Sequence, residues 1–439
     1  MTFVEGFIWL VSHRAVVVGW IVAIILAALS SSAHALLTHH DRLPDFAAVP
    51  TIASMRDGAW ADPATWDVQR VPTASDVVRV THQVRYASPS GQVAVVGCRH
   101  GCRLTFAADV STRLTVGTLV IHHGGTLEMI VSDPKVTAEL IIADQPLDTT
   151  NDPQQWGTGL LAAGAVKIAG AARSGWHHVA SEPRAGETVL TLREPPTAWQ
   201  PGDVLYVPDT RAVTPGSLKP GAQTTTPQWE RPVIARVEGA QVHLTAPLRF
   251  DHLGGYDATT GVLDSCCLPA VANLTRNVVI RSANPAGTRG HVAFLDRATV
   301  DVRHARFQHL GRTTAFVLNS TLLDVHGNVH RIGTNQIGRY AVHAHHLIGP
   351  TGLPAETPQF TFEGLVVEGF KRWGLVLHNS HHGLVRDAVA VDGNGAGFTT
   401  EDGSETENVF ERCYAAQMIG SGEPPYGLRP SDPGSDFGH

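Results

Sequence analysis

The segment GRYAVHAHHLIG at residues 338–349 and the segment FTFEGLVVEGFKRWGLVLHNSHHGLVRDAVAVDGNGAGFTTED at residues 360–402 behave as a stack of similar short repeats. When the second segment is laid on itself with a shift of 23 residues, its apolar runs coincide and His378 falls on Glu401. Short apolar runs bounded by Gly, Asn and Asp are typical of strands and turns. A period of this length without helical periodicity predicts a β-solenoid.

A ladder of polar side chains follows from this repeat. Equivalent positions on successive coils of a parallel solenoid lie one strand spacing apart, about 4.8 Å. We therefore expect His345, His378 and Glu401 to face one another. Asn319, in the preceding coil, is expected at a roughly equivalent place.

The residue types of the ladder suit two kinds of chemistry. His343 and His345 are two apart in a predicted strand, so both rings should face the same side. Imidazoles beside a carboxylate can bind a divalent metal ion or act as a general acid–base pair. Polar ladders in β-solenoids are also often structural stacks of hydrogen-bonded side chains, and the sequence leaves both interpretations open.

Composition favours an all-β chain. The 439 residues include 43 Gly and 27 Pro, and only 7% are aromatic, as expected for many short strands and turns. Outside the N-terminus, no amphipathic helical pattern stands out. The chain is too long for one ordinary core, but its length suits one elongated solenoid with a smaller module.

The charge pattern is uneven. A net charge of -7 excludes a globally basic nucleic-acid binder, so we expect no nucleic-acid partner. Residues 276–339 contain nine Arg and three Asp, whereas residues 340–439 contain five Lys or Arg and thirteen Asp or Glu. The basic stretch could bind an anionic polymer, or its arginines could simply face water.

The N-terminus has the pattern of an export signal. Residues 15–29 form an unbroken apolar run, and Ala33 and Ala35 give an AxA cleavage pattern. Residues 1–35 are therefore predicted to be a signal peptide or an N-terminal membrane anchor. Either one places the rest of the chain outside the cytoplasm, secreted or membrane-anchored, with membrane contact only through this segment.

Four further regions follow a predicted linker at residues 36–58. Solenoid-like strand pairs occupy residues 59–181, and residues 186–251 predict a small antiparallel module of barrel or sandwich type. Coils resume over residues 273–420. Residues 421–439 have a loop-like composition without a polar cap for the last coil, which favours a fragment of a longer protein.

The five cysteines do not suggest a disulfide scaffold. Cys98 and Cys102 flank one tight loop and could form a disulfide, Cys266 and Cys267 are adjacent, and Cys413 stands alone. No CxxC pair offers a zinc signature.

Several segments, in this order, resemble one known family. They are WADPATW at 60–66, RVPTASDVV at 70–78, PGDVLYV at 201–207, LTAPLRFDH at 244–252, NLTRNVVIRS at 273–282, and GFTTEDGSETENVFE at 397–411. Together with GRYAVHAHHLIG they resemble the cell-surface hyaluronidase and cell-migration-inducing hyaluronidase family, with more distant similarity to fibrocystin-like proteins. The stretch at residues 59–181 resembles the G-eight domain of such proteins.

The resemblance implies a right-handed parallel β-helix of the pectin-lyase type behind a G-eight domain. It also implies an extracellular setting and depolymerisation of hyaluronan, which depends on calcium in some members. The family motif RYxxHxH matches Arg339, Tyr340, His343 and His345, and the motif EDG matches Glu401, Asp402 and Gly403. Ala344 replaces an aromatic residue, which puts a sugar-stacking surface and the same substrate in doubt.

Three functions remain open. The first is an extracytoplasmic depolymerase of an acidic polysaccharide, in which Glu401 and Asp402 act as the two carboxylates of a glycosidase. Adjacent strand residues point to opposite faces, so only one of them can join the ladder unless a turn intervenes. An elimination at a uronate is another route to the same products. The second function is a non-catalytic glycan-binding or adhesion module, and the third is a structural surface solenoid.

A metal-assisted form of the first function assigns roles to further residues. His343, His345 and His378 would be ligands of calcium or zinc, with Glu401 as a ligand or a base. Arg339 would bind a substrate carboxylate through two hydrogen bonds, and Tyr340 would be a second substrate contact.

Overall fold

The computed structural model describes residues 43–211, 226–257, 259–314, 318–347 and 357–419. The chain divides into two compact units, Met1–Pro44 and Asp45–His439, and the description below concerns the second. The predicted signal peptide or anchor and the predicted tail at residues 421–439 lie outside the described residues. Within the described residues, no helix has the length and apolar character needed to cross a membrane.

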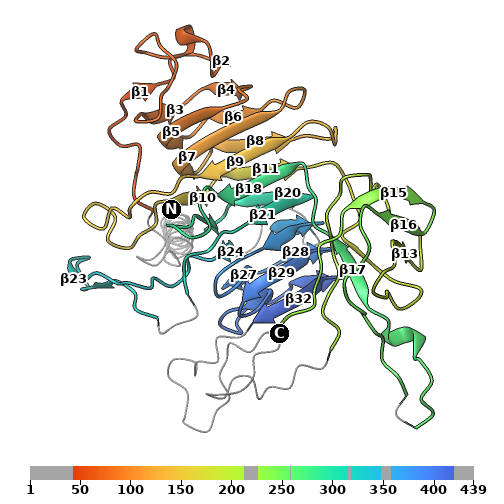
Figure 1. Ribbon diagram of the computed structural model, residues 1–439. Coiled ribbons are helices and arrows are strands. Elements are labelled where there is room, and N and C mark those ends of the chain that lie inside the picture. The colour runs from red at the N-terminus through yellow and green to blue at the C-terminus, as the bar shows by residue number, and fades with distance from the viewer. Residues whose placement is uncertain (1–42, 212–225, 258, 315–317, 348–356, 420–439) are drawn as a thin grey trace, which may run out of the picture. The chain divides into compact units, whose positions relative to one another are not determined.

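Most of the second unit is a parallel β-helix, which confirms the all-β prediction (Figure 1). From residue 112 on, each coil contributes three strands, one to each of three faces. The first face contains β10 (Gly159–Ala162), β19 (His291–Leu295), β24 (Val342–His345), β27 (Leu375–His378) and β30 (Phe398–Thr400). The second face contains β11 (Ala165–Ala169), β20 (Thr299–Arg303), β25 (Phe360–Glu363), β28 (Gly383–Arg386) and β31 (Val409–Glu411). The third face contains β9 (Ala138–Ile142), β18 (Val278–Ser282), β21 (Ala305–Gln308), β26 (Val366–Glu368), β29 (Val389–Asn394) and β32 (Tyr414–Ile419).

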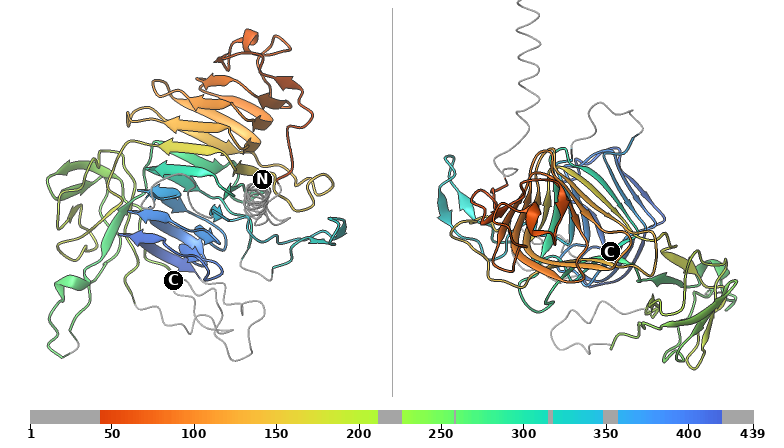
Figure 2. Two further views of the ribbon diagram at one scale, coloured as in Figure 1. Left: turned by 180° about the vertical axis from the view of Figure 1, so that it is seen from behind. Right: turned by 90° about the horizontal axis from the view of Figure 1, so that it is seen from above.

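The repeat seen in the sequence sets the strand register. Val366 pairs with Val389 and Leu375 pairs with Phe398, which is the shift of 23 residues found in the sequence. β-branched and aromatic side chains suit this pleated, buried environment. In the interior, Phe294 and Phe362 lie with ring centroids 5.8 Å apart, and both are fully buried. The view along the stack in Figure 2 shows the coils superimposed around this shared interior.

The region predicted as a G-eight domain forms the first coils of the same stack. Its strands are β3 (Val77–Val80), β4 (Gln83–Tyr86), β5 (Gly91–Cys98), β6 (Arg103–Phe106), β7 (Thr112–Ile121) and β8 (Thr126–Ile130). The long strand β7 pairs with β9 through its first half and with β10 through its second half. One strand therefore feeds both the first and the third face, and one hydrophobic core continues through all coils.

The linker prediction for residues 36–58 is wrong over its described C-terminal part. Two short strands, β1 (Ile52–Ala53) and β2 (Gly58–Ala59), pair in parallel with β3 and β4. A short 3-10 helix, η2 (Pro63–Thr65), follows them. The sequence hid these strands because each has only two residues, too few to show alternation. Trp60 and Trp66 pack edge to face behind them, with ring centroids 5.1 Å apart. Cys98 and Cys102, which the sequence left open as a pair, form a disulfide.

The predicted antiparallel module is present, but it is larger than expected. One sheet contains β13 (Val189–Thr191), β15 (Ile234–Glu238) and β16 (Gln241–Leu244). The other contains β12 (Trp176–His178), β14 (Leu205–Tyr206) and β17 (Ala270–Asn273), with η4 (Ser265–Cys267) before its last strand. The module has its own hydrophobic core. It extends beyond 186–251 because strands from both flanks complete its second sheet.

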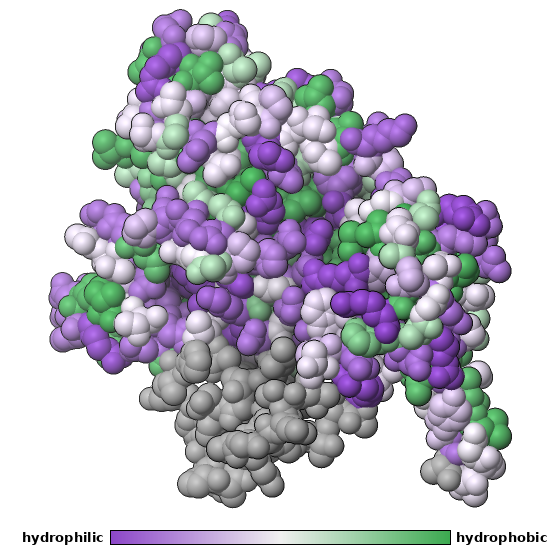
Figure 3. Space-filling view, in the orientation of Figure 1, coloured by the Kyte–Doolittle hydropathy of each residue, from purple (hydrophilic) through white to green (hydrophobic). Residues whose placement is uncertain are grey.

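Corners of the coils place side chains outside the core. At the corner between the second and third faces, His304, Asp387 and Arg412 all have a positive φ, and Gly364 has the equivalent position. A Cβ at Gly364 would lie 2.3 Å from Nδ1 of His304, so glycine lets that imidazole pack on the next coil. On the face seen in Figure 3, hydrophilic and hydrophobic residues are interspersed. A small hairpin, β22 (Leu322–Leu323) with β23 (Val329–Arg331), leaves the stack between β21 and β24.

Candidate functional site

The predicted ladder forms at the corner that follows the first face. β24 and β27 pair so that His345 lies opposite His378, and their rings are stacked with centroids 4.9 Å apart. Leu377 pairs with Thr400, so Glu401 follows directly on the next coil beside His378. The predicted order of His345, His378 and Glu401 is therefore confirmed. We call the group at this corner the histidine ladder; its members are His343, His345, His346, His378 and Glu401.

The expectation for Asn319 is wrong. Leu295 on β19 lies opposite His345, at the level where Asn319 was expected. Asn319 instead forms an antiparallel bridge with Asn335 in the long connection between β21 and β24. That connection leaves the coil, so its residues do not follow the register of the strands.

His343 points to the ladder, as its spacing from His345 predicted. The two ring centroids lie 5.0 Å apart. Nδ1 of His343 donates to the carbonyl of Gly338 at 3.0 Å, which directs Nε2 towards Glu401 Oε2 at 3.8 Å. Burial lowers the pKa of His343 well below its usual value, and the neighbouring histidines lower it further. The neutral ring therefore presents a lone pair to the ladder.

Tyr340 is buried and orients Glu401. Its hydroxyl donates to Oε1 of Glu401 at 2.7 Å, and its ring packs edge to face on His343 at 5.0 Å. Burial raises the pKa of Tyr340 well above its usual value, and Glu401 adds to this. Tyr340 therefore acts as a donor that fixes the carboxylate. Because Tyr340 is fully buried, the structure offers no support for its predicted substrate contact.

His378 lies between two carboxylates. Its Nδ1 is 3.0 Å from Oε2 of Glu401, and its Nε2 is 3.8 Å from Oδ2 of Asp402. Burial alone would lower the pKa of His378, but Glu401, Asp402 and Glu405 raise it overall. Both adjacent carboxylates reach the same ring because the chain bends at residues 401–403. The turn that the sequence argument required is therefore present.

Sequence reasoning missed one member of the ladder. His346 follows β24 with a φ of 57°, and its ring stacks on His345 with centroids 3.9 Å apart. Strict strand alternation would point it away from His345. One signal was available in the sequence. His346 directly follows His345 at a strand end, and residues at these corners often have a positive φ.

The donor set fits zinc better than calcium. One ligand atom from each of His343, His378 and Glu401 lies within 4.8 Å of the others, and the same holds for His345, His346 and His378. Imidazole nitrogen with one carboxylate suits zinc, whereas calcium prefers six to eight oxygen ligands. The hydrogen bonds that His343 donates to Gly338 and that Tyr340 donates to Glu401 are outer contacts of the kind that orient metal ligands.

Arg339 and Ala344, which the sequence linked to substrate binding, have other roles in the fold. Arg339 is buried and donates to the carbonyls of Gln154, Gln155 and Ile337, and its guanidinium lies 3.9 Å from the centre of the Trp156 ring. These contacts hold the first-face coils together, so the structure gives no support for a substrate contact. Ala344 is fully buried, and an aromatic side chain there would enter the core. The expected loss of a sugar-stacking surface is therefore wrong, because side chains alternate along β24.

Four arginines of the basic stretch at residues 276–339 bond to other segments of the fold. Arg276 and Arg312 are held by backbone carbonyls from distant segments. Arg303 and Arg306 pair with Glu363 and with Glu368 on the next coil. These arginines bond the coils to one another, and Arg303 also faces water, since 44% of its side chain is exposed.

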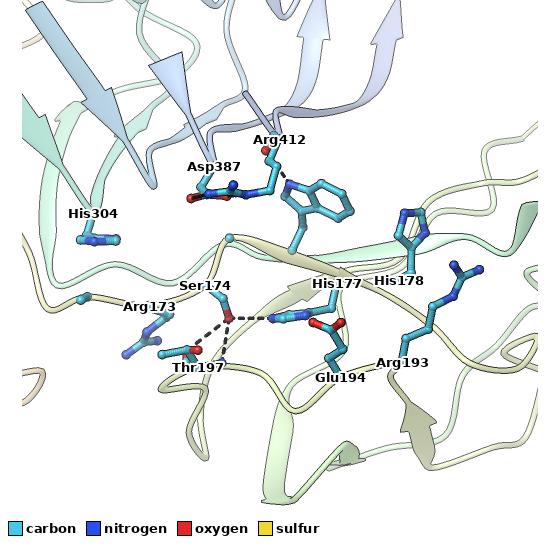
Figure 4. A pocket seen from close by; sticks show the side chains of 13 residues that line it. Arg173, Ser174, His177, His178, Arg193, Glu194, Thr197, His304, Asp387 and Arg412 are labelled. Carbon is cyan, nitrogen blue, oxygen red and sulfur yellow. Dashed lines mark hydrogen bonds and ion pairs between the residues drawn. The ribbon is translucent and has the colours of Figure 1, made fainter. Parts of the chain in front are cut away.

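Apart from the histidine ladder, a polar cleft of about 590 Å³ lies between the antiparallel module and the corner of the second and third faces (Figure 4). Ser174 accepts or donates a hydrogen bond with Nε2 of His177 at 2.9 Å, and Arg412 binds both oxygens of Asp387 at 2.8 Å. Burial lowers the pKa of His177, against the effect of Glu194 and Asp387. The lining residues come from widely separated segments, so no local sequence pattern predicts the cleft. It shares no residue with the histidine ladder.

Comparison with known proteins confirms the predicted resemblance. Residues 316–422 match the family model described as CEMIP beta-helix, and this range contains the whole histidine ladder. Human fibrocystin-L is 24% identical over 385 residues, which cover 80% of this chain and 8% of that protein. A G8 domain-containing protein of Dictyostelium discoideum is 23% identical over 396 residues, which cover 86% of this chain and 30% of that protein.

A third relative carries a functional name. The cell migration-inducing and hyaluronan-binding protein of Mus musculus is 25% identical over 262 residues, which cover 58% of this chain and 17% of that protein. The chain therefore spans less than a third of the length of each of these relatives.

Proposed function

We propose that this protein is an extracytoplasmic, polysaccharide-acting β-helix protein that binds an acidic glycan of hyaluronan type at the histidine ladder and shortens it there. The observation that carries the proposal is the position of His378 between Glu401 and Asp402, with further imidazoles stacked on it. The name of the mouse relative, a hyaluronan-binding protein, supports the glycan class.

The two carboxylates differ in burial, and this difference assigns them different roles. The Glu401 side chain is only 7% exposed and is fixed by Tyr340 and His378. The Asp402 side chain is 49% exposed and faces solvent at the same corner. Glycoside cleavage needs one group that protonates the leaving oxygen and another that acts on the opposite side. Asp402 is the carboxylate that can reach a bound chain. Glu401 supplies the negative charge beside the histidines of the ladder.

A zinc ion fits the proposal as a cofactor. His343, His378 and Glu401 would hold it, with His345 and His346 beside them. Bound there, it would polarise an oxygen of the glycan or of water. The half-buried rings of His345 and His346 stack on each other beside these three residues.

The test is the chain length of hyaluronan after incubation with the purified protein, measured by size-exclusion chromatography with light scattering. We expect shortening by the wild type and its loss in His378→Ala and Asp402→Asn. His326→Ala, an exposed histidine outside the ladder, is the matched control and should keep wild-type activity. An unsaturated end group in the products would indicate elimination rather than hydrolysis. Binding without shortening would contradict the enzymatic part and support a binding module.

A further inference from the structure

A cluster of basic side chains lies on the same corner as the histidine ladder, several coils away. Arg79, Arg99, His100, His122 and His123 line a cleft of about 530 Å³ on the first coils. We call this cluster the cationic corner patch. Neither the proposed mechanism nor the family motifs use any of these residues.

Strand register connects the patch to the ladder. Cys98 pairs with Ile121, Ile121 with Ala162, Ala162 with Phe294, and Phe294 with Ala344. The residue after each of these positions starts the same corner. Arg99, His122, Ala163, Leu295 and His345 therefore form one column. In Figure 1, β5, β7, β10, β24 and β27 follow one another down one side of the stack.

The distance along this column suits one extended ligand. Three coil steps separate His122 from His345, which at about 4.8 Å per step is roughly 14 Å. The column between them consists of Ala163 and Leu295, two apolar side chains. Leu295 is fully buried and Ala163 is half-buried, so a polysaccharide chain that reaches both the basic patch and the ladder would pass over the side chains that cover Leu295.

The patch already holds a carboxylate. Asp45 binds Nη2 of Arg99 and lies 3.9 Å from Nε2 of His122. Among the described residues, Nε of Arg99 and Nε2 of His122 are buried without a hydrogen-bond partner. Buried polar groups of this kind are normally satisfied by a partner or by water. At the edge nearest the ladder, Asp296 lies 3.2 Å from Nε2 of His123.

We propose that the cationic corner patch binds a uronate carboxylate of the same acidic glycan that reaches the histidine ladder, in competition with the carboxylate of Asp45. This inference rests on the proposed function, because it assigns a second contact to the same glycan. Arg99 and His122 are the groups that bind the anion. Arg79 supports the site, since its guanidinium is held by the carbonyl of Ala47.

The competition predicts effects of opposite sign. Arg99→Gln should lower the affinity for a hyaluronan decasaccharide roughly tenfold, the factor expected for one partly exposed hydrogen bond to a charged group. Asp45→Asn should raise the affinity severalfold, because it removes the competing charge but keeps an oxygen that can accept from the Ala47 amide. Calorimetric titration of the full chain at low ionic strength measures both, and added salt should weaken the wild-type binding.

Matched controls come from the opposite end of β7. Arg113 and Glu139 form an exposed ion pair there, and Arg113→Gln and Glu139→Gln should leave the decasaccharide affinity unchanged. If Arg99→Gln does not fold, His122→Gln replaces it, because His122 is the other proposed anion-binding group, and this variant should lower the affinity as well. Circular dichroism and the urea midpoint check each fold.

The outcomes separate this inference from the proposed function. Opposite shifts in Arg99→Gln and Asp45→Asn support the patch as a glycan contact. Unchanged affinities in both variants, with a wild type that binds the decasaccharide, overturn the inference and leave the proposed function in place. A folded wild type that neither binds nor shortens hyaluronan overturns both.

Discussion

Replacing Glu368 with Gln tests how the coils and the antiparallel module are held together. The Glu368 side chain, at the end of β26, is fully buried. It binds Arg306 on the neighbouring coil and Arg231 of the module. Glutamine has the same size but no charge, so the substitution leaves both arginines without this counter-charge. Glu368 therefore connects the β-helix to the antiparallel module.

The expected cost follows from burial. Breaking a buried ion pair costs about 3–5 kcal/mol, because one charge remains without compensation. Arg306 is 18% exposed and Arg231 is 29% exposed, and Asp392 stays 3.3 Å from Arg231. These contacts with water and with a second carboxylate place the expected loss near the lower limit, about 3 kcal/mol. Glu411→Gln, whose carboxylate is 39% exposed, is the matched control and should cost at most about 1 kcal/mol.

Urea unfolding followed by tryptophan fluorescence measures both variants. The pH dependence gives an independent check. Burial alone would raise the pKa of Glu368, but Arg306 and Arg231 lower it overall, below the ordinary 4.5. The carboxylate therefore contributes stability above about pH 4.5, and this contribution is lost as the pH falls through the lowered pKa. Equal midpoints for Glu368→Gln and Glu411→Gln at neutral pH would refute the reasoning.

Three further changes have defined outcomes. Tyr340→Phe removes the hydroxyl that donates to Glu401, and should lower zinc affinity about 10–100-fold in a chelator competition while the fold is kept; unchanged affinity would argue against an orienting role. Gly383→Ala places a Cβ 1.9 Å from the Phe360 ring and should cost about 1–3 kcal/mol in urea unfolding, whereas a neutral result would mean that the ring can move aside. Asp76→Asn weakens the contacts to Arg70, Thr51 and Thr73 and should cost about 2 kcal/mol. Arg70 holds the pKa of Asp76 below its usual value despite burial, so the wild type should lose this contribution as the pH falls below about 4 and the variant should not; parallel pH profiles would contradict this.

The sequence predicted the parts of the fold that repeat. The shift of 23 residues placed Leu375 opposite Phe398 and His378 beside Glu401, because parallel coils keep one register. Residues outside the repeat were harder to place. Asn319 lies in a connection that leaves the coil, and the strand Ile52–Ala53 is too short to show alternation.

The candidate site was predictable in its ladder and less so in its supporting contacts. The two-residue spacing of His343 and His345 and the family motifs pointed to the cluster. Tyr340 is a buried donor to Glu401, and Arg339 donates to the carbonyls of Gln154 and Gln155. These partners lie far away in the sequence, so no local pattern indicated the contacts. The place of His346 depends on a positive φ at a corner, which strand alternation does not indicate.

The central claim is that the histidine ladder is a metal-binding site on a glycan-acting β-helix. Elemental analysis of the purified wild type and of the folded double variant His345→Ala, His378→Ala, each after incubation with zinc and with calcium, tests it most directly. We predict near-stoichiometric zinc in the wild type, its loss in the variant, and no comparable calcium content. A folded wild type without zinc, or a variant that retains it, would contradict the claim.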